Sequence, residues 1–177
     1  IASCLVGSEM CIRDSFGGAD DAQDAGISTV YQEVNLAPNL SIGENVMLGH
    51  ELRGVFGINW TATHRAATDA LSRLGLGHLD TRRPLSTLSI ALQQLVAISR
   101  AMAIKAKVLI LDEPTSSLDA AEVDGLFTVI RALRDQGVAI LFVSHFLDQV
   151  YAISDRLTVL RNGLYEGEYL TRDLDRH

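Results

Sequence analysis

The chain has 177 residues, of which 47% are hydrophobic and 21% charged, so it suits one globular domain with a buried core and is not a disordered chain. Fifteen basic residues against 22 acidic ones leave a net charge of −7, which argues against a protein that binds nucleic-acid backbones. No apolar run approaches the roughly 20 residues that a membrane-spanning helix needs. The two cysteines, Cys4 and Cys11, give no sign of a disulfide framework and are typical of a reducing, cytosolic setting.

Residues 1–15 (IASCLVGSEMCIRDS) follow neither a helical nor a strand period, and they lack the basic start and apolar stretch of a signal peptide. Their last ten letters resemble a translated sequencing-adapter scar of the kind found in assembled environmental DNA. The alternative is an ordinary disordered N-terminus. We interpret 1–15 as a non-native scar and expect the native fold to begin near Phe16.

The first hundred residues are predicted to hold one strand among short helices. The predicted elements are a helix over 20–25, a strand over 27–31, and helices over 41–48, 63–74 and 89–103. Ser41 and Glu44 have the spacing of a capping box at the start of the third of these elements. Residues 51–60 are predicted to be an irregular link.

The second half alternates between strands and helices. The predicted elements are buried strands over 108–111 and 138–143, a helix between them, a short helix over 146–153, and strands over 156–160 and 164–170 joined by an Asn-Gly turn. Asp119 caps the helix between the buried strands and Gly137 ends it, and its inward apolar stripe is Val123, Leu126, Phe127, Ile130 and Leu133. Strands that alternate with helices and lack polar positions predict an α/β domain with a parallel sheet.

Two adjacent carboxylates, Asp112 and Glu113, end the apolar strand in VLILDEP. Ligands of open α/β sheets bind at the carboxyl ends of the strands, and burying acids there is costly unless a cation or a protic group uses them. The pair therefore suggests a Mg²⁺–nucleotide site, in which Asp112 holds Mg²⁺ through water and Glu113 polarises the attacking water. The alternative for an isolated Asp-Glu pair is a solvated junction between strand and turn.

Two further polar residues also follow predicted strands. His145 ends the next strand and can reach the same edge of the sheet, although an isolated histidine there is more often a capping residue. Gln32 closes the first strand, where its amide can contact metal and water; alone it is a weak signal. The segment 115–119 (TSSLD) lies between this acidic pair and the next predicted helix. It either belongs to the site or simply caps the helix, and Asp119 is suited to capping in both cases.

Four sequence motifs follow one another along the chain: YQE (31–33), LSIALQQ (88–94), LILDEPTSSLD (109–119) and VSH (143–145). This set resembles the ATP-binding cassette of ABC transporters over about residues 16–173. The resemblance implies a P-loop NTPase fold with a RecA-like core and a helical subdomain. It also implies that the protein is an ATPase whose cofactors are ATP and Mg²⁺.

The resemblance assigns roles to single residues. Gln32 corresponds to the Q-loop glutamine, which also contacts the metal, and Asp112 to the Walker B acid that holds Mg²⁺. Glu113 corresponds to the catalytic glutamate and His145 to the switch histidine. Asp119 closes the D-loop beside the nucleotide.

The family's signature segment is altered in this chain. Ser89 is kept, but Ile90 and Ala91 stand where the family has glycines and Leu92 where it has glutamine. By resemblance, Ser89 and the backbone at Ala91 contact ATP bound to a second cassette. Relaxed signatures occur in monosaccharide importers, and the string FLDQVYAISDRLTVLRNG (146–163) resembles the first cassette of their tandem ATPases, of ribose, galactose or galactofuranose type.

The sequence contains no G-x-x-x-x-G-K-[ST] motif, which would hold the phosphates. Its two lysines, Lys105 and Lys107, do not follow a glycine. We therefore expect an internal piece of a longer subunit, without the P-loop and the strands before it and without a second cassette, that does not hydrolyse ATP on its own.

The resemblance also divides the chain and names its partners. Residues 27–32 and 105–170 correspond to the core, and 41–100 to a helical subdomain that faces membrane permease subunits. Residues 33–38 (EVNLAP) line the groove for the permease, or alternatively form an ordinary loop. The other partners that the resemblance implies are the second cassette and, indirectly, a periplasmic sugar-binding protein. It also implies that the subunit is a peripheral protein on the cytoplasmic face of the inner membrane.

Two other functions compete with sugar import. A non-transport ABC ATPase that acts on DNA or ribosomes needs basic surfaces, which the net charge of −7 opposes. A catalytically weak regulatory half fits the altered signature, but Glu113 and His145 oppose it because a regulatory site could lose both. The sequence does not identify the sugar.

Overall fold

The computed structural model describes residues 16–31 and 36–174. The proposed scar, Gln32 and the start of the 33–38 segment lie outside the described residues. Within the described part, no helix is long and apolar enough to cross a membrane.

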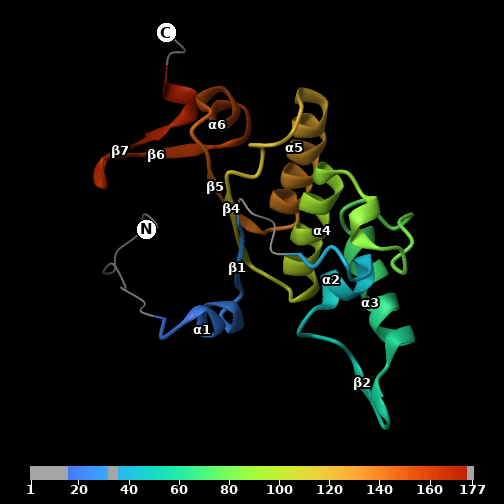
Figure 1. The fold of residues 1–177 in the computed structure, drawn as a ribbon. Helices are drawn as coiled ribbons and strands as arrows, with labels where there is room; N and C mark the ends of the chain where they lie inside the picture. Colours follow the sequence, from blue (N-terminus) through green and yellow to red (C-terminus); the bar gives the residue numbers. More distant parts are fainter. Residues whose placement is uncertain (1–15, 32–35, 175–177) are drawn as a thin grey trace.

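Three parallel strands form the central sheet in the order β1-β4-β5 (Figure 1). They are β1 (Ile27–Val30), β4 (Val108–Asp112) and β5 (Ala139–Val143). The first strand follows helix α1 (Ala19–Asp24), and Gly26 between them takes a φ of 91°, which a glycine adopts without strain. The parallel sheet confirms the predicted α/β class, and the three strands lie where the apolar runs predict them.

Two long helices cover one side of this sheet (Figure 1). Helix α4 (Ile90–Ala103) packs against β1, and α5 (Ala120–Asp135) packs against β5 and α4. The predicted inward stripe of α5 is confirmed, since its buried residues are Leu126, Phe127, Ile130 and Leu133. The edge-to-face contact of Phe127 with Phe142 joins α5 to β5.

A cluster of helices continues from the sheet through α4. Helices α2 (Ile42–Met47) and α3 (Trp60–Ser72) pack on each other and on α4. The side chains that close this cluster are fully buried and apolar: Ile42, Val46, Ala67, Leu71, Leu85, Val96 and Ile98. Leu85 belongs to a short 3₁₀ turn (Leu85–Thr87) just before α4. One apolar core therefore connects the helical cluster to the sheet.

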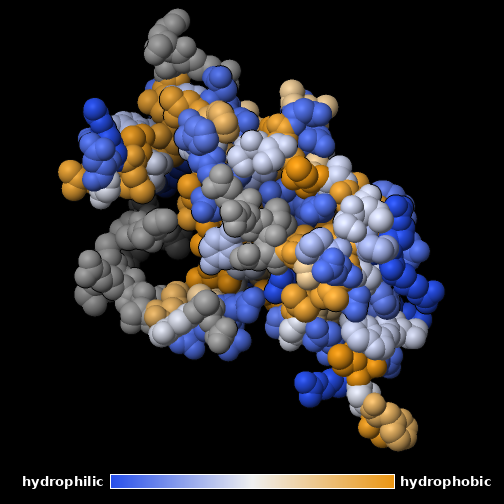
Figure 2. Space-filling model, viewed as in Figure 1, coloured by the Kyte–Doolittle hydropathy of each residue, from blue (hydrophilic) through white to orange (hydrophobic). Residues whose placement is uncertain are grey.

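The link predicted to be irregular is instead a small antiparallel hairpin. It pairs β2 (Arg53–Gly54) with β3 (Gly57–Ile58), and its tip, Val55 and Phe56, is 92% and 102% exposed. Figure 2 shows this apolar tip standing out from the surface. Helix α3 begins at Trp60, three residues before the predicted start, because the side chain of Asn59 accepts a hydrogen bond from Ala62 N and caps the helix.

The chain ends in a short helix and a second hairpin. Helix α6 (Leu147–Ile153) follows β5, and β6 (Arg156–Arg161) pairs antiparallel with β7 (Leu164–Leu170) through the predicted Asn162-Gly163 turn. A one-turn 3₁₀ helix (Thr171–Asp173) follows β7. The prediction of a fully buried strand over 138–143 is wrong: both ends of β5 are exposed, and its middle is half-buried.

The turn before α2 is fixed by polar contacts that involve a buried asparagine. Asn45 is fully buried; its carboxamide accepts from Ala37 N at 2.7 Å and donates to Ala37 O at 2.9 Å. It also donates to Ser41 O at 2.9 Å. The predicted capping box is present, with Ser41 N donating to Glu44 Oε2 at 2.8 Å. These contacts attach the described end of the 33–38 segment to α2.

The capping box makes stability depend on pH. Hydrogen bonds from the side chain and backbone of Ser41 hold the pKa of Glu44 below its usual value of 4.5. A depressed carboxylate pKa stabilises the fold above the unfolded-state pKa, and this contribution is lost as the pH falls through the folded-state pKa. We expect Glu44→Gln to be less stable than the wild type at neutral pH and the difference to shrink on acidification. Denaturant titrations at several pH values measure it, and a difference that stays constant or grows in acid would contradict the pairing.

Candidate functional site

The site is built where two neighbouring strands end together. In the parallel register of the sheet, Asp112 lies opposite Val143, the last residue of β5. Glu113 follows β4 directly, and His145 follows β5 after one residue, Ser144. Because parallel strands bring their carboxyl ends to the same edge, residues separated by 32 positions in the sequence meet here.

Glu113 and His145 form a direct hydrogen bond. The His145 Nδ1 atom lies 2.8 Å from Glu113 Oε1. An ionised carboxylate only accepts hydrogen bonds, so Nδ1 carries the proton and donates it. The Glu113 side chain is 18% exposed, whereas that of His145 is 68% exposed. The predicted meeting of these residues at the sheet edge is confirmed, with the carboxylate on the protected side and the imidazole on the open side.

The backbone of Glu113 is strained and tightly held. Its φ is +48°, in the left-handed region that costs residues with a side chain free energy. Its N–H donates to Val143 O at 2.9 Å, which ties it to the neighbouring strand. Its second carboxylate oxygen, Oε2, is buried and has no hydrogen-bond partner within the described chain. A strained residue that buries an unpaired acceptor is costly for folding, and such costs are typical of functional positions.

Asp112 supplies a second carboxylate at the same edge, where it is half-buried. The described residues contain no cluster of three or more His, Cys, Asp or Glu that could cage a metal. A Mg²⁺ ion bound with a nucleotide needs only one or two carboxylates, because phosphate oxygens and water complete its shell. The oxygen donors of Asp112 and Glu113 fit that kind of ion.

The other predicted site residues lie at helix starts. Ser89 caps α4, and its Oγ accepts from Leu92 N at 3.4 Å; Ala91 lies in the first turn. Asp119 caps α5 and forms a capping box with Glu122. No hydrogen bond joins Ser89 to Glu113 or His145, all three of which the structure describes. Gln32 lies outside the described residues.

One contact at the site was not predicted from the sequence. Thr115 Oγ1 lies 2.5 Å from Gln149 Oε1, and Thr115 is 3% exposed. The only signal for it in the sequence is positional, since Thr115 comes two residues after Glu113 and Gln149 four after His145.

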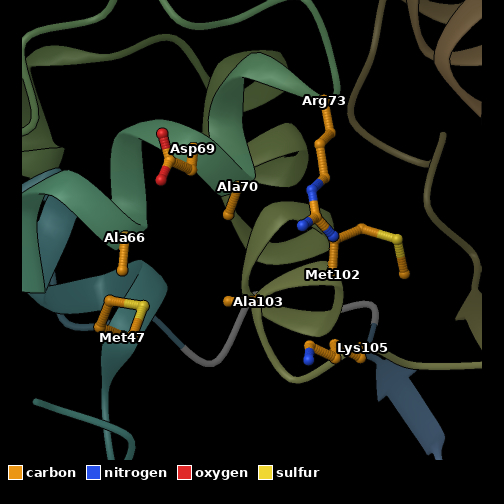
Figure 3. Close-up of a pocket in the computed structure, with 8 residues that line it drawn as sticks. All are labelled: Met47, Ala66, Asp69, Ala70, Arg73, Met102, Ala103 and Lys105. Atoms are coloured by element: carbon orange, nitrogen blue, oxygen red, sulfur yellow. The ribbon is translucent and has the colours of Figure 1, made fainter.

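A small pocket lies elsewhere, between the helices, with a volume of about 180 Å³ (Figure 3). Its walls come from α2, α3 and the end of α4: Met47, Ala66, Asp69, Ala70, Arg73, Met102, Ala103 and Lys105. The Glu113–His145 pair does not line it, so the pocket is separate from the site at the sheet edge.

Comparison with known proteins supports the resemblance that the sequence motifs indicate. The family profile described as ABC transporter matches residues 12–116. The fructose import ATP-binding protein of Bifidobacterium longum is 66% identical over 161 residues, covering 91% of this chain and 31% of that protein. The galactofuranose transporter ATP-binding protein of Escherichia coli K12 is 53% identical over 146 residues, covering 82% of this chain and 29% of that protein.

The chain thus spans about a third of the length of these curated relatives. Among solved structures, an ATP-binding cassette in a dimeric post-hydrolysis state, bound to ADP and phosphate, matches with a TM-score of 0.70. It is 26% identical, and the match covers 88% of this chain and 68% of that one. This match confirms the fold class expected from the motifs, an α/β ATP-binding cassette of the P-loop NTPase type.

The left-handed backbone of Glu113 makes a stability prediction. Glu113→Gly removes both the positive-φ strain and the buried unpaired Oε2, so we expect it to stabilise the chain by about 1 kcal/mol. The control is Ala132→Gly on the exposed face of α5, where glycine should destabilise by about 1 kcal/mol. Denaturant unfolding measures both. A loss of stability at position 113 as large as that at position 132 would show that Glu113 is not strained.

Proposed function

Because this chain belongs to the ABC transporter family, we propose that it forms part of an ATP-hydrolysing subunit that drives the import of a monosaccharide. The observation that carries the proposal is the hydrogen-bonded Glu113–His145 pair beside Asp112, at the edge of the sheet where a nucleotide phosphate would lie. Sugar as the cargo rests on the relatives, which are named for fructose and galactofuranose transport.

In this proposal Glu113 is the general base. Its carboxylate accepts a proton from the attacking water, while the water oxygen bonds to the terminal phosphorus and the bond to the bridging oxygen breaks. Because Oε1 is taken by His145, the attacking water would donate to Oε2, which has no partner in the described chain and has to be uncovered before water reaches it. Tying down one oxygen leaves the other in a fixed direction.

His145 has two tasks in the same step. Through Nδ1 it orients the Glu113 carboxylate, and its Nε2 is the ring nitrogen that would meet a phosphate oxygen. Its exposure of 68% suits a residue that meets a ligand from outside the sheet.

Asp112 would hold Mg²⁺, which when bound supplies positive charge against the phosphates. Gln32 would contact the same metal and water. Ser89, the backbone at Ala91, and Asp119 would meet nucleotide at the contact with a second cassette, where the first turn of α4 presents backbone N–H groups.

The partner that we propose is a membrane permease, with the subunit on the cytoplasmic face of the membrane. We assign 41–100 to the subdomain that faces it and 27–32 with 105–170 to the catalytic core. The packing of α2, α3 and α4 into one cluster supports this division. Asn45 attaches the loop at Ala37 to that cluster, so a movement of the loop would reach the helices directly.

The catalytic role of Glu113 is tested in a chimaera, in which residues 16–174 of this chain replace the matching segment of the Bifidobacterium longum protein, 66% identical. We expect Glu113→Gln to retain ATP binding and lower kcat by about 10²–10⁴-fold, because a general base contributes that much. Phosphate release and nucleotide binding are the measurements, with Glu166→Gln at an exposed position of β7 as the matched control. A Glu113→Gln enzyme with the kcat of the unmodified chimaera would exclude Glu113 as the base.

The role of the 33–38 loop is tested through Asn45. We expect Asn45→Ala to lower sugar uptake per ATP hydrolysed, because the backbone of Ala37 loses both of its hydrogen bonds to α2. The assay uses the same chimaera with the relative's permease in membrane vesicles. Exposed Asn39→Ala is the control. An uptake-to-hydrolysis ratio that matches the control would refute coupling through this loop.

A further inference from the structure

Helix α6 begins just after His145 and has little apolar anchorage: of its residues, all described, only Ile153 packs, partly buried, against the apolar core. Its seven residues begin two positions after His145, and none of the seven, all of them described, is buried. Burial of an apolar face is what normally fixes a helix in place. The position of α6 must therefore depend more than usual on specific polar contacts.

Two such contacts join α6 to the body of the domain. Thr115 Oγ1 donates to Gln149 Oε1 at 2.5 Å, and Arg131 Nη2 donates to the carbonyl oxygen of Ala152 at 3.1 Å. The second contact lies on the exposed surface, whereas Thr115 is 3% exposed. Gln149 is half-buried, so the Thr115–Gln149 bond is partly shielded from water, and a shielded hydrogen bond is stronger than an exposed one. This bond is therefore the main polar anchor of α6.

The Thr115–Gln149 hydrogen bond joins the same two segments of the chain as the Glu113–His145 hydrogen bond. Glu113 and Thr115 lie on the turn after β4, and His145 and Gln149 lie on the segment after β5. The two hydrogen bonds thus form parallel links between one turn and one helix start. If the inner link breaks, α6 gains freedom to rotate, and the exposed His145 ring is no longer held at 2.8 Å from Glu113.

We propose that Thr115 and Gln149 are positioning residues: their hydrogen bond holds α6 in the orientation that keeps His145 on Glu113. The inference rests on the proposed function and adds two residues to it. Neither touches the substrate; they act through His145. Gln149 acts as the acceptor, and the Thr115 hydroxyl is the buried donor that would otherwise be unpaired.

The first test is structural and uses the chain itself. Hydrogen exchange of the amides of Gln149 and Val150, which both donate to Phe146 O, reports whether α6 is anchored. We expect Gln149→Leu and Thr115→Val to accelerate this exchange, while amides in the middle of α5 keep their rates. Thr115→Ser retains a hydroxyl and should restore protection. Unchanged α6 exchange in both Gln149→Leu and Thr115→Val would overturn the proposal.

The second test is catalytic and uses the chimaera described above. We expect Gln149→Leu and Thr115→Val each to lower kcat about 10–100-fold with KM for ATP unchanged, since a displaced catalytic group affects the chemical step rather than binding. The double variant should be no worse than either single one, and Thr115→Ser should recover most of the rate. Gln136→Leu, at the exposed end of α5, is the matched control.

The outcomes separate this inference from the proposed function. An unmodified chimaera without Glu113-dependent hydrolysis would contradict the proposed function, and the exchange experiment would still decide whether the bond anchors α6. An active chimaera whose kcat is unaffected by Gln149→Leu, or whose KM rises while kcat is kept, would overturn the positioning role alone. If Gln149→Leu fails to fold, Thr115→Val and Thr115→Ser decide the matter between them.

Discussion

The parallel pairing of β4 with β5 is the constraint on which the whole site depends. Because Asp112 lies opposite Val143, both strands stop at the same level, and the next few residues of each must share one edge of the sheet. The Glu113 N–H then bonds to Val143 O, and the Glu113 carboxylate reaches His145 Nδ1. A shift of register by one residue would turn every side chain to the other face and separate the acid from the histidine.

The free-energy cost of the site is concentrated in one residue. Glu113 combines a left-handed backbone with a buried, unpaired oxygen, and neither feature helps the domain to fold. The surrounding structure offsets the cost through the apolar contacts of β4, where Leu109 and Leu111 are fully buried between neighbouring strands and helices. A rigid strand therefore supports a strained acid, while the opposing histidine lies on an exposed segment held by hydrogen bonds. In the Glu113–His145 pair, the acid is therefore the rigidly held member and the histidine the more mobile one.

Most helices, strands and turns were predicted correctly because the residues that specify them lie close together in the sequence. The capping box at Ser41, the inward stripe of α5 and the Asn162-Gly163 turn each depend on residues a few positions apart, and all three are confirmed. The early start of α3 was missed because Asn59 was not recognised as its cap, and the hairpin after α2 has only two residues in each strand. The burial of β5 was predicted wrongly because an apolar composition does not determine what covers a strand. The Glu113–His145 meeting followed from strand order, whereas Thr115–Gln149 depends on the angle of α6, which no local pattern encodes.

The most direct test of the account is a crystal structure of the Glu113→Gln chimaera with Mg-ATP. The account predicts the terminal phosphate at the carboxyl edge of β4 and β5, with His145 Nε2 within hydrogen-bonding distance of a phosphate oxygen and the metal shell joined to Asp112 directly or through water. A nucleotide whose phosphates lie away from that edge, for example against the helices α2 and α3, would contradict it.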